Sequence, residues 1–112
     1  MHPNSSSSNT IFGSIPWMAP EVIRQTKYGR KSDIWSFGCT VLEMATGQPP
    51  WLDQNFDNPI AAIMKIGISD EIPKIPDHLD PKLKDFLSKC LKRRPEERLG
   101  CVELGRHPFL RD

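Results

Sequence analysis

The 112-residue sequence predicts an all-α fold. Apolar residues recur at the three- and four-residue spacing of a helix face in successive segments. Prolines stand where several of these segments begin, which suits the first turn of a helix. No stretch of useful length alternates apolar and polar residues, so no β-strand is predicted.

The first predicted helix begins at Pro20, because a proline ring presets the φ angle that a first helical turn needs. Glu21 then lies near the positive end of the helix dipole, and Val22 and Ile23 supply a short apolar face. The pattern breaks at residues 27–30, so this helix is expected to be short.

The central predicted helix is the longest one. Ser32 or Asp33 is its expected N-cap, and Gly47 is its expected end, ahead of Pro49 and Pro50. Its apolar residues run nearly all the way round the helix instead of forming one stripe. This pattern is typical of a helix buried on every side, and a chain of 112 residues supplies few neighbours to bury it.

Shorter helices are predicted at residues 58–67, 80–91 and 101–104. The first two have a proline, Pro59 or Pro81, at the first helical position. The link at residues 72–76 contains two prolines and is expected to be extended. The apolar face of the 80–91 helix follows the spacing i, i+3, i+4, i+7 and i+8 and consists of Leu83, Phe86, Leu87, Cys90 and Leu91.

Charge and composition exclude several classes of protein. With 15 Lys and Arg against 14 Asp and Glu, the net charge of +1 cannot supply the phosphate attraction of a nucleic-acid-binding protein. No run approaches the ~18 consecutive apolar residues of a membrane span, and the N-terminus lacks the pattern of a signal peptide. We therefore expect neither a nucleic-acid partner nor a membrane partner.

The cysteines point to packing. Cys39, Cys90 and Cys101 are an odd number at wide spacing with no C-x-x-C, which fits neither a disulfide framework nor a metal site. Reduced thiols in a cytoplasmic or nuclear chain account for them most simply. No metal ligands are predicted.

Residues 13–21 resemble the end of a protein-kinase activation segment, which closes on the Ala-Pro-Glu motif. Further kinase landmarks follow in the expected order at residues 32–38, 47–51, 80–81, 90–98 and 107–109. The amino-acid sequence of residues 17–23 and 38–44 is most similar to that of serine/threonine kinases of the mitogen-activated protein kinase kinase kinase group. The resemblance implies that residues 11–110 are the C-terminal-lobe portion of the α+β protein kinase-like fold.

The resemblance implies a substrate loop at Gly13, Ser14, Ile15, Pro16 and Trp17. In the complete enzyme the Ser14 hydroxyl would touch the catalytic aspartate, and Pro16 and Trp17 would line the pocket for the residue after the phosphoacceptor. The alternative is a turn that lets Trp17 pack inward. The order Ile15-Pro16 departs from the commoner proline-then-aromatic order, which leaves the substrate preference open.

The resemblance also implies a structural ion pair between Glu21 and Arg98, with Arg94 as the competing partner. A planar guanidinium can hold a carboxylate through two parallel hydrogen bonds. His107 is expected to be a packing residue, since no nucleophile accompanies it in the sequence.

Asp33, Trp35 and Gly38 are implied to anchor the central helix. Asp33 is either an N-cap or, as in the family, an acceptor that fixes the backbone of the catalytic loop. That loop is absent from this sequence, so capping is the role expected of Asp33 here.

Residues 1–10 form a polar, serine-rich stretch that we expect to be disordered, and residues 111–112 form a tail. The family carries activating phosphorylation in the region of residues 1–10, which makes its hydroxyl residues candidate phosphosites; they are Ser5, Ser6, Ser7, Ser8 and Thr10. A solvated serine tail is the alternative for each of them.

ATP and Mg²⁺ are implied by the family only. The sequence has no G-x-G-x-x-G, V-A-I-K, H-R-D or D-F-G, so it contains no residue that would hold ATP or Mg²⁺. We therefore expect one part of a serine/threonine kinase that transfers the γ-phosphate of ATP to a protein substrate, here a truncated product that is inactive alone.

Two alternatives remain at this point: a non-catalytic module that binds or scaffolds other proteins, and a product that does not fold. The expected partner is a protein substrate, such as a downstream kinase that docks on the helix at residues 58–67. The parts that cover one side of the central helix in a kinase are missing, so an exposed apolar face and self-association are also expected.

Overall fold

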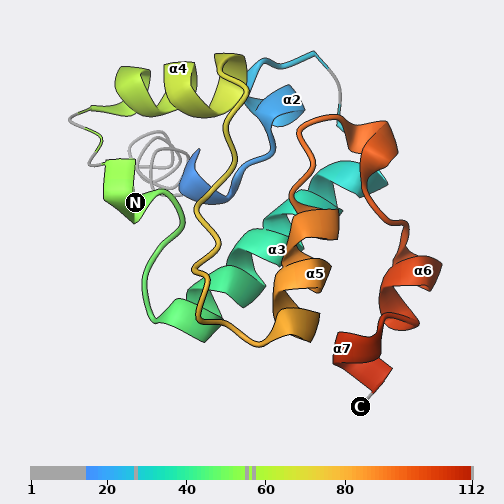
Figure 1. The fold of residues 1–112 in the computed structure, drawn as a ribbon. Coiled ribbons are helices and arrows are strands. Elements are labelled where there is room, and N and C mark those ends of the chain that lie inside the picture. Colours follow the sequence, from blue (N-terminus) through green and yellow to red (C-terminus); the bar gives the residue numbers. More distant parts are fainter. Residues whose placement is uncertain (1–14, 27, 55, 57, 112) are drawn as a thin grey trace, which may run out of the picture.

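Helix α3, Arg30–Thr46, runs diagonally through the middle of the molecule, and helix α5 lies beside it (Figure 1). The computed structural model describes residues 15–26, 28–54, 56 and 58–111. In these ranges the elements, in which η denotes a 3₁₀ turn, are η1 (Ile15–Trp17), α2 (Pro20–Ile23), α3 (Arg30–Thr46), η2 (Leu52–Gln54), α4 (Pro59–Ile68), α5 (Pro81–Cys90), η3 (Pro95–Glu97), α6 (Cys101–Gly105) and α7 (Pro108–Arg111). The described part contains no strand, so the all-α prediction is confirmed.

Local signals set the starts of the predicted helices. Helix α2 begins at Pro20. The Asn58 side chain accepts a hydrogen bond from the Ala61 N–H (2.8 Å) and caps α4, and the Asp80 carboxylate accepts one from the Lys82 N–H (2.9 Å) and caps α5. Residues 72–76, predicted to be extended, belong to no helix, strand or turn.

The predicted start of α3 is wrong by a few residues. The helix begins at Arg30, because the Ser32 hydroxyl accepts a hydrogen bond from the Gly29 N–H (3.2 Å) from inside the first turn. Its predicted end is confirmed: Gly47 has a φ of +74°, and its N–H donates to the Glu43 carbonyl (2.7 Å). Glycine suits this left-handed position because it has no side chain.

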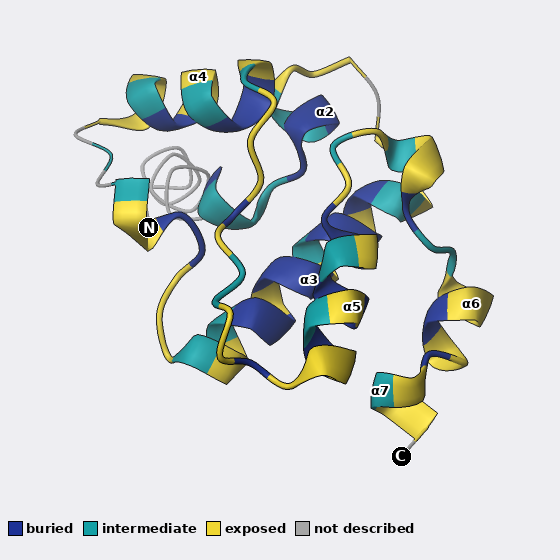
Figure 2. Cartoon of the chain, viewed as in Figure 1, coloured by how far each residue is buried: buried dark blue, intermediate teal, exposed yellow. Residues whose placement is uncertain are grey.

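Helices α3 and α5 form the centre of the core. A Cβ atom placed on Gly38 would lie 2.7 Å from the Cβ of Cys90, so the close approach of the two helices depends on a glycine there. Figure 2 shows the buried residues gathered along α3 and α5, whereas α6 and α7 are mostly exposed. The largest fully buried side chains include Trp35, Phe86, Ile66, Leu87 and Leu91.

The thiols of Cys39 and Cys90 belong to this core. Burial raises the pKa of the Cys39 thiol well above its usual range and raises the pKa of Cys90 to about 12. Both side chains therefore stay protonated and pack as small apolar groups, while Cys101 is exposed at the start of α6.

One stripe of α3 is exposed. It carries Asp33, Phe37, Thr40 and Met44, which the helical repeat places on one face. Phe37 is 44% exposed and Met44 is 72% exposed. Within the described residues, therefore, α3 is buried on its other sides and open along this stripe.

The end of the chain differs slightly from the prediction. A further helix, α7, follows α6, because the His107 Nδ1 accepts a hydrogen bond from the Phe109 N–H (3.0 Å) and caps the first turn. None of the described helices combines the length and apolar character needed to cross a membrane.

Candidate functional site

The structure joins Glu21 of α2 to Arg98, 77 residues later in the chain. Nη1 of Arg98 donates to Oε2 of Glu21 (2.8 Å), and Nη2 donates to Oε1 (2.9 Å). The Arg98 side chain is 0% exposed and the Glu21 side chain is 3% exposed. This is a buried ion pair with two parallel hydrogen bonds.

The remaining guanidinium donors of Arg98 are also used. Nε donates to the Lys92 carbonyl (2.6 Å), and the two Nη atoms donate to the carbonyls of Lys31 (2.7 Å) and Arg93 (3.2 Å). The guanidinium carbon lies 5.2 Å from the ring centroid of Trp35. An arginine has five N–H donors, and this arrangement gives each of them an acceptor.

Glu21 is held from a second direction. The Ser32 hydroxyl donates to Oε2 of Glu21 (2.7 Å). Burial raises the pKa of the Glu21 carboxyl, but the hydrogen bonds from Arg98 and Ser32 outweigh it, and the pKa lies below its ordinary value of 4.5. The carboxylate is therefore kept ionised and fixed between α2, the start of α3 and the segment after η3.

Arg94, the competing partner considered from the sequence, does not contact Glu21. It is exposed, and its Nη1 lies 4.0 Å from Oε2 of Glu97. The geometry selects Arg98 because that residue enters the core beside Trp35, whereas Arg94 precedes the η3 turn on the surface.

The loop at η1 is fastened to α3 by two hydrogen bonds. The indole Nε1 of Trp17 donates to Oε1 of Glu43 (2.9 Å), and the Ser36 hydroxyl donates to the Trp17 carbonyl (2.8 Å). Ile15 is buried, and Pro16 and Trp17 are half-buried. Trp17 therefore packs inward and is also held in a defined orientation on α3.

The sequence reasoning missed Glu43 and Ser36. A usable signal was present, since Glu43 is the one acidic residue in the apolar run from Val41 to Ala45 and Trp17 brings a donor that needs an acceptor when buried. The remaining residues of the predicted loop, Gly13 and Ser14, lie outside the described residues, as do the candidate phosphosites Ser5, Ser6, Ser7, Ser8 and Thr10.

The capping role expected of Asp33 is wrong. Asp33 lies inside the first turn of α3, and its Oδ1 accepts a hydrogen bond from the Tyr28 hydroxyl (2.6 Å). This contact raises the pKa of the Tyr28 hydroxyl. The other expected anchors, Trp35 and Gly38, are buried at the contact of α3 with Arg98 and α5.

His107 packs in the core of the C-terminal segment. Its ring lies edge-on to Phe86, with centroids 5.3 Å apart, and its Nε2 is 2.7 Å from Oδ2 of Asp85. Since Nδ1 accepts from the Phe109 N–H, the neutral ring carries its proton on Nε2 and donates it to Asp85. Among the described residues, no group of three or more His, Cys, Asp or Glu side chains could hold a metal ion.

The sequence is similar to those of known proteins. The family model "Protein kinase domain" matches residues 1–110. Mitogen-activated protein kinase kinase kinase 3 of Arabidopsis thaliana is 49% identical over 105 residues, which is 94% of this chain and 16% of that protein. Mitogen-activated protein kinase kinase kinase A of Dictyostelium discoideum is 48% identical over 94% of this chain and 11% of that protein.

A human relative, mitogen-activated protein kinase kinase kinase 1, is 44% identical over 101 residues, which is 90% of this chain and 7% of that protein. The chain thus spans a small part of the length of these relatives. The match of the family model over nearly all of the sequence, together with the Glu21–Arg98 pair, leads to one conclusion. The chain belongs to the protein kinase domain family.

Proposed function

We propose that this chain supplies the substrate loop and the helical C-terminal lobe of a serine/threonine kinase of the mitogen-activated protein kinase kinase kinase type. The observation that carries the proposal is the buried, two-bonded pair of Glu21 and Arg98, which fixes α2 directly after the loop. The identities of 44–49% with kinases of that type over at least 90% of the chain support the same assignment.

In this proposal the Glu21–Arg98 pair positions helix α2. Glu21 holds α2 against the core, and Trp17 is tied to α3 through Glu43 and Ser36. The loop that ends at Trp17 is thus anchored at two places on rigid helices, which is what a surface that receives a protein substrate requires. Ser14 would add the hydroxyl that meets the catalytic aspartate of the complete enzyme.

The residues present do not fit a Mg²⁺–ATP site. The sequence lacks the motifs that cradle the phosphates and hold the metal, and the described side chains include no metal-binding cluster. We therefore infer that these 112 residues transfer no phosphate by themselves and contribute to catalysis only within a complete kinase domain.

A chimera tests this proposal. Residues 11–110 replace the matching segment of a related mitogen-activated protein kinase kinase kinase, and phosphorylation of a downstream kinase is measured. The chimera should be active and the 112-residue chain inactive. Trp17→Ala in the chimera should raise the KM for the protein substrate, with the KM for ATP unchanged. Phosphate transfer by the chain alone would contradict the proposal, and so would a folded but inactive chimera.

The second candidate function is a kinase-derived binding module. It is favoured by the outer face of α4, where Ile60 is 70% exposed, Met64 is 55% exposed and Ile68 is 68% exposed. We assign this face to a protein substrate such as a downstream kinase.

We propose the cytoplasm or the nucleus as the location of the chain, on the basis of its unpaired cysteines.

A further inference from the structure

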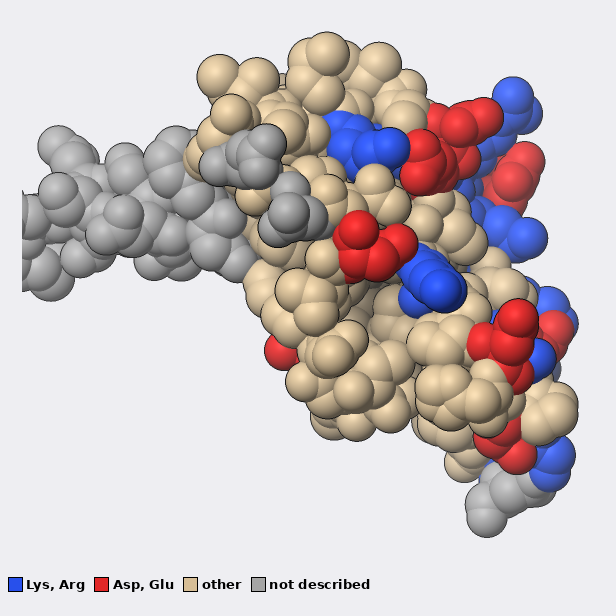
Figure 3. Space-filling view, turned by 60° about the vertical axis from the view of Figure 1, so that its left-hand side comes forward, with Lys and Arg blue, Asp and Glu red and all other residues tan. Residues whose placement is uncertain are grey.

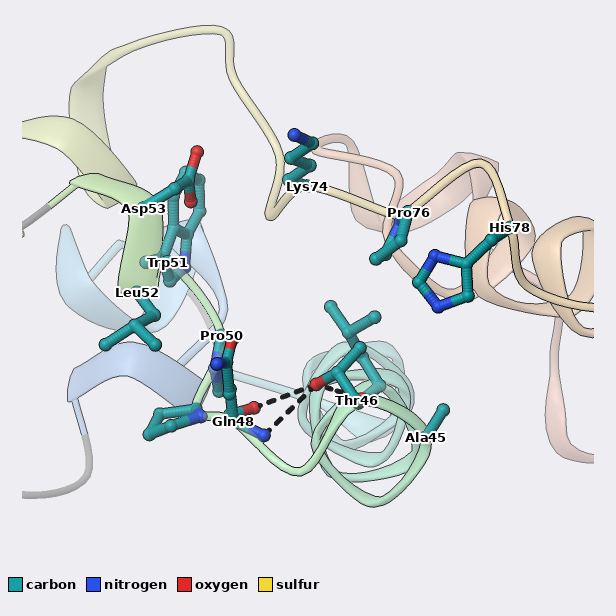
Figure 4. A pocket seen from close by; sticks show the side chains of 12 residues that line it. Ala45, Thr46, Gln48, Pro50, Trp51, Leu52, Asp53, Lys74, Pro76 and His78 are labelled. Carbon is teal, nitrogen blue, oxygen red and sulfur yellow. Dashed lines mark hydrogen bonds between the residues drawn. The ribbon is translucent and has the colours of Figure 1, made fainter.

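A pocket of about 490 Å³ opens where α3 ends. One wall is the segment that follows α3, with Pro50 and Asp53, and the opposite wall is formed by Lys74 and Pro76 of the link at residues 72–76 and by His78 in the turn after it (Figure 4). Thr46 and Ala45, from the last turn of α3, lie between the two walls. Neither the Glu21–Arg98 pair nor the η1 loop contributes a residue to the lining of this pocket.

Two apolar residues that line the pocket, Leu42 and Trp51, are buried, and we call them its floor. Leu42 is 3% exposed and Trp51 is 3% exposed. Trp51 has a φ of +67°, a left-handed conformation that costs a bulky side chain about 1–3 kcal/mol. Among the described residues its buried indole N–H has no hydrogen-bond partner, which is a second cost. Costs of this kind persist where the surroundings hold a side chain in place, and they concentrate at sites that clamp a ligand.

The rim of the pocket carries unpaired positive and polar groups. Lys74 on the link and His78 in the turn after it are exposed, and neither side chain forms a hydrogen bond or ion pair with another described residue. Asp53, on the opposite wall, accepts a hydrogen bond from the Gln54 side chain (3.3 Å). The two walls therefore differ in charge, and a ligand that bridges them is oriented by that difference.

The link also offers free backbone groups. Residues 72–76 belong to no helix, strand or turn, and within the described part of the chain Lys74 and Ile75 take part in no backbone hydrogen bond. An extended segment with unpaired N–H and C=O groups is a template for pairing with a second extended chain. This feature favours a peptide over a compact small molecule as the occupant.

The surroundings of the pocket fit a protein partner. Figure 3 brings forward the side of the molecule that carries α4 and η2; large parts of this face are uncharged, while a few acidic and basic side chains lie within it and more lie along one margin. Leu52 of η2 borders the pocket and is 52% exposed. A partner can therefore bury apolar surface around the pocket while its charged groups meet the rim.

We propose that this pocket binds an extended, acidic segment of a partner protein. An apolar side chain of the segment lies on the floor formed by Leu42 and Trp51. A neighbouring carboxylate pairs with Lys74 and His78, and the backbone of the segment pairs with the link. Asp53 excludes the reverse orientation, because it would face the same carboxylate with a like charge.

The test is a nuclear magnetic resonance titration of the ¹⁵N-labelled chain with two synthetic peptides. In one peptide, leucines alternate with aspartates, and in the matched peptide lysines replace the aspartates. We expect the aspartate peptide to bind about tenfold more tightly and to shift the amide signals of residues 74, 75 and 77–79 and the indole signal of Trp51. Lys74→Glu combined with His78→Glu should reverse the preference, and Lys92→Glu, outside the pocket, should leave it unchanged.

Equal affinity for the two peptides would overturn the proposal, and so would signal changes confined to other regions. Retention of the aspartate preference in the double variant would do the same. The titration is repeated with the chimeric kinase domain described above, so the result does not depend on the folding of the 112-residue chain alone. Peptide affinity and phosphate transfer are separate readouts, so this proposal and the proposed function can fail independently.

Discussion

Arg98 connects segments that are distant in the sequence. Its guanidinium bonds the carboxylate of Glu21 and the carbonyls of Lys31, Lys92 and Arg93, and the Lys31 ammonium in turn donates to the Arg98 carbonyl (2.6 Å). A lysine has no planar fork of donors and could not reproduce this pattern. The position therefore requires arginine for its geometry as well as its charge.

Replacing Glu21 by alanine should lower the free energy of unfolding by about 3–5 kcal/mol, because it leaves the buried guanidinium of Arg98 without its counter-charge. Urea denaturation followed by circular dichroism measures this change. Glu97→Ala, at an exposed position, should change the free energy by no more than about 0.5 kcal/mol. A loss below about 0.5 kcal/mol for Glu21→Ala would show that the pair contributes little.

The same pair predicts how stability depends on pH. The pKa of Glu21 is lowered in the folded chain, so its contribution is complete above the ordinary value of 4.5 and is lost as the pH falls through the lower folded-state pKa. Glu21→Gln should therefore remove part of the loss of stability on acidification. Parallel slopes for the wild type and Glu21→Gln below pH 4.5 would contradict this expectation.

At the scale of elements, the contact of α3 with α5 depends on Gly38. Within α3 this glycine is unfavourable for helix formation by roughly 1 kcal/mol relative to alanine. The close approach to Cys90 and Leu91 explains why it is nevertheless suited to the position. Gly38 therefore lowers the local stability of α3 and allows α3 and α5 to approach closely.

Gly38→Ala should lower the free energy of unfolding by about 1–3 kcal/mol, because the added Cβ would lie 2.7 Å from the Cβ of Cys90 and force the helices apart. Gly105→Ala is the matched control, since a Cβ there meets nothing within 4 Å. Chemical denaturation of both variants gives the comparison. A stabilising Gly38→Ala would show that the α3–α5 contact yields at little cost.

At the scale of the whole molecule, we expect the exposed stripe of α3 to determine whether the chain associates with itself. Phe37 and Met44 present apolar surface on the longest helix of the described part. Apolar surface of this kind promotes association. A second copy of the chain is the partner that we propose for it.

Phe37→Ser combined with Met44→Ser should weaken self-association by about tenfold, because the apolar contact of these two side chains is lost. Size-exclusion chromatography with light scattering, over a range of concentrations, measures the mass. Met64→Ser, on the exposed face of α4, is the control of the same residue type. If the wild type is monomeric throughout, or if both variants behave alike, the stripe is not the contact.

Much of the fold follows from short stretches of sequence. Pro20, Asn58 with Pro59, and Asp80 with Pro81 begin helices, and Gly47 ends one, because caps and fixed φ angles act within a single turn. The start of α3 was predicted less well, because the hydrogen bond of Ser32 to Gly29 moves it to Arg30. The resemblance led us to expect an exposed apolar side of the central helix, and Phe37 and Met44 are exposed on α3.

The sequence by itself determined the helical class, the order of the helices from α2 to α6 and, through the motifs, the resemblance to the kinase family. Tertiary structure decided which arginine meets Glu21, that Glu43 and Ser36 hold Trp17, and that Trp51 and Lys74 line one pocket. The residues joined by these hydrogen bonds lie between 19 and 77 positions apart in the sequence. No local pattern specifies them, because they arise only when packed helices bring their side chains together.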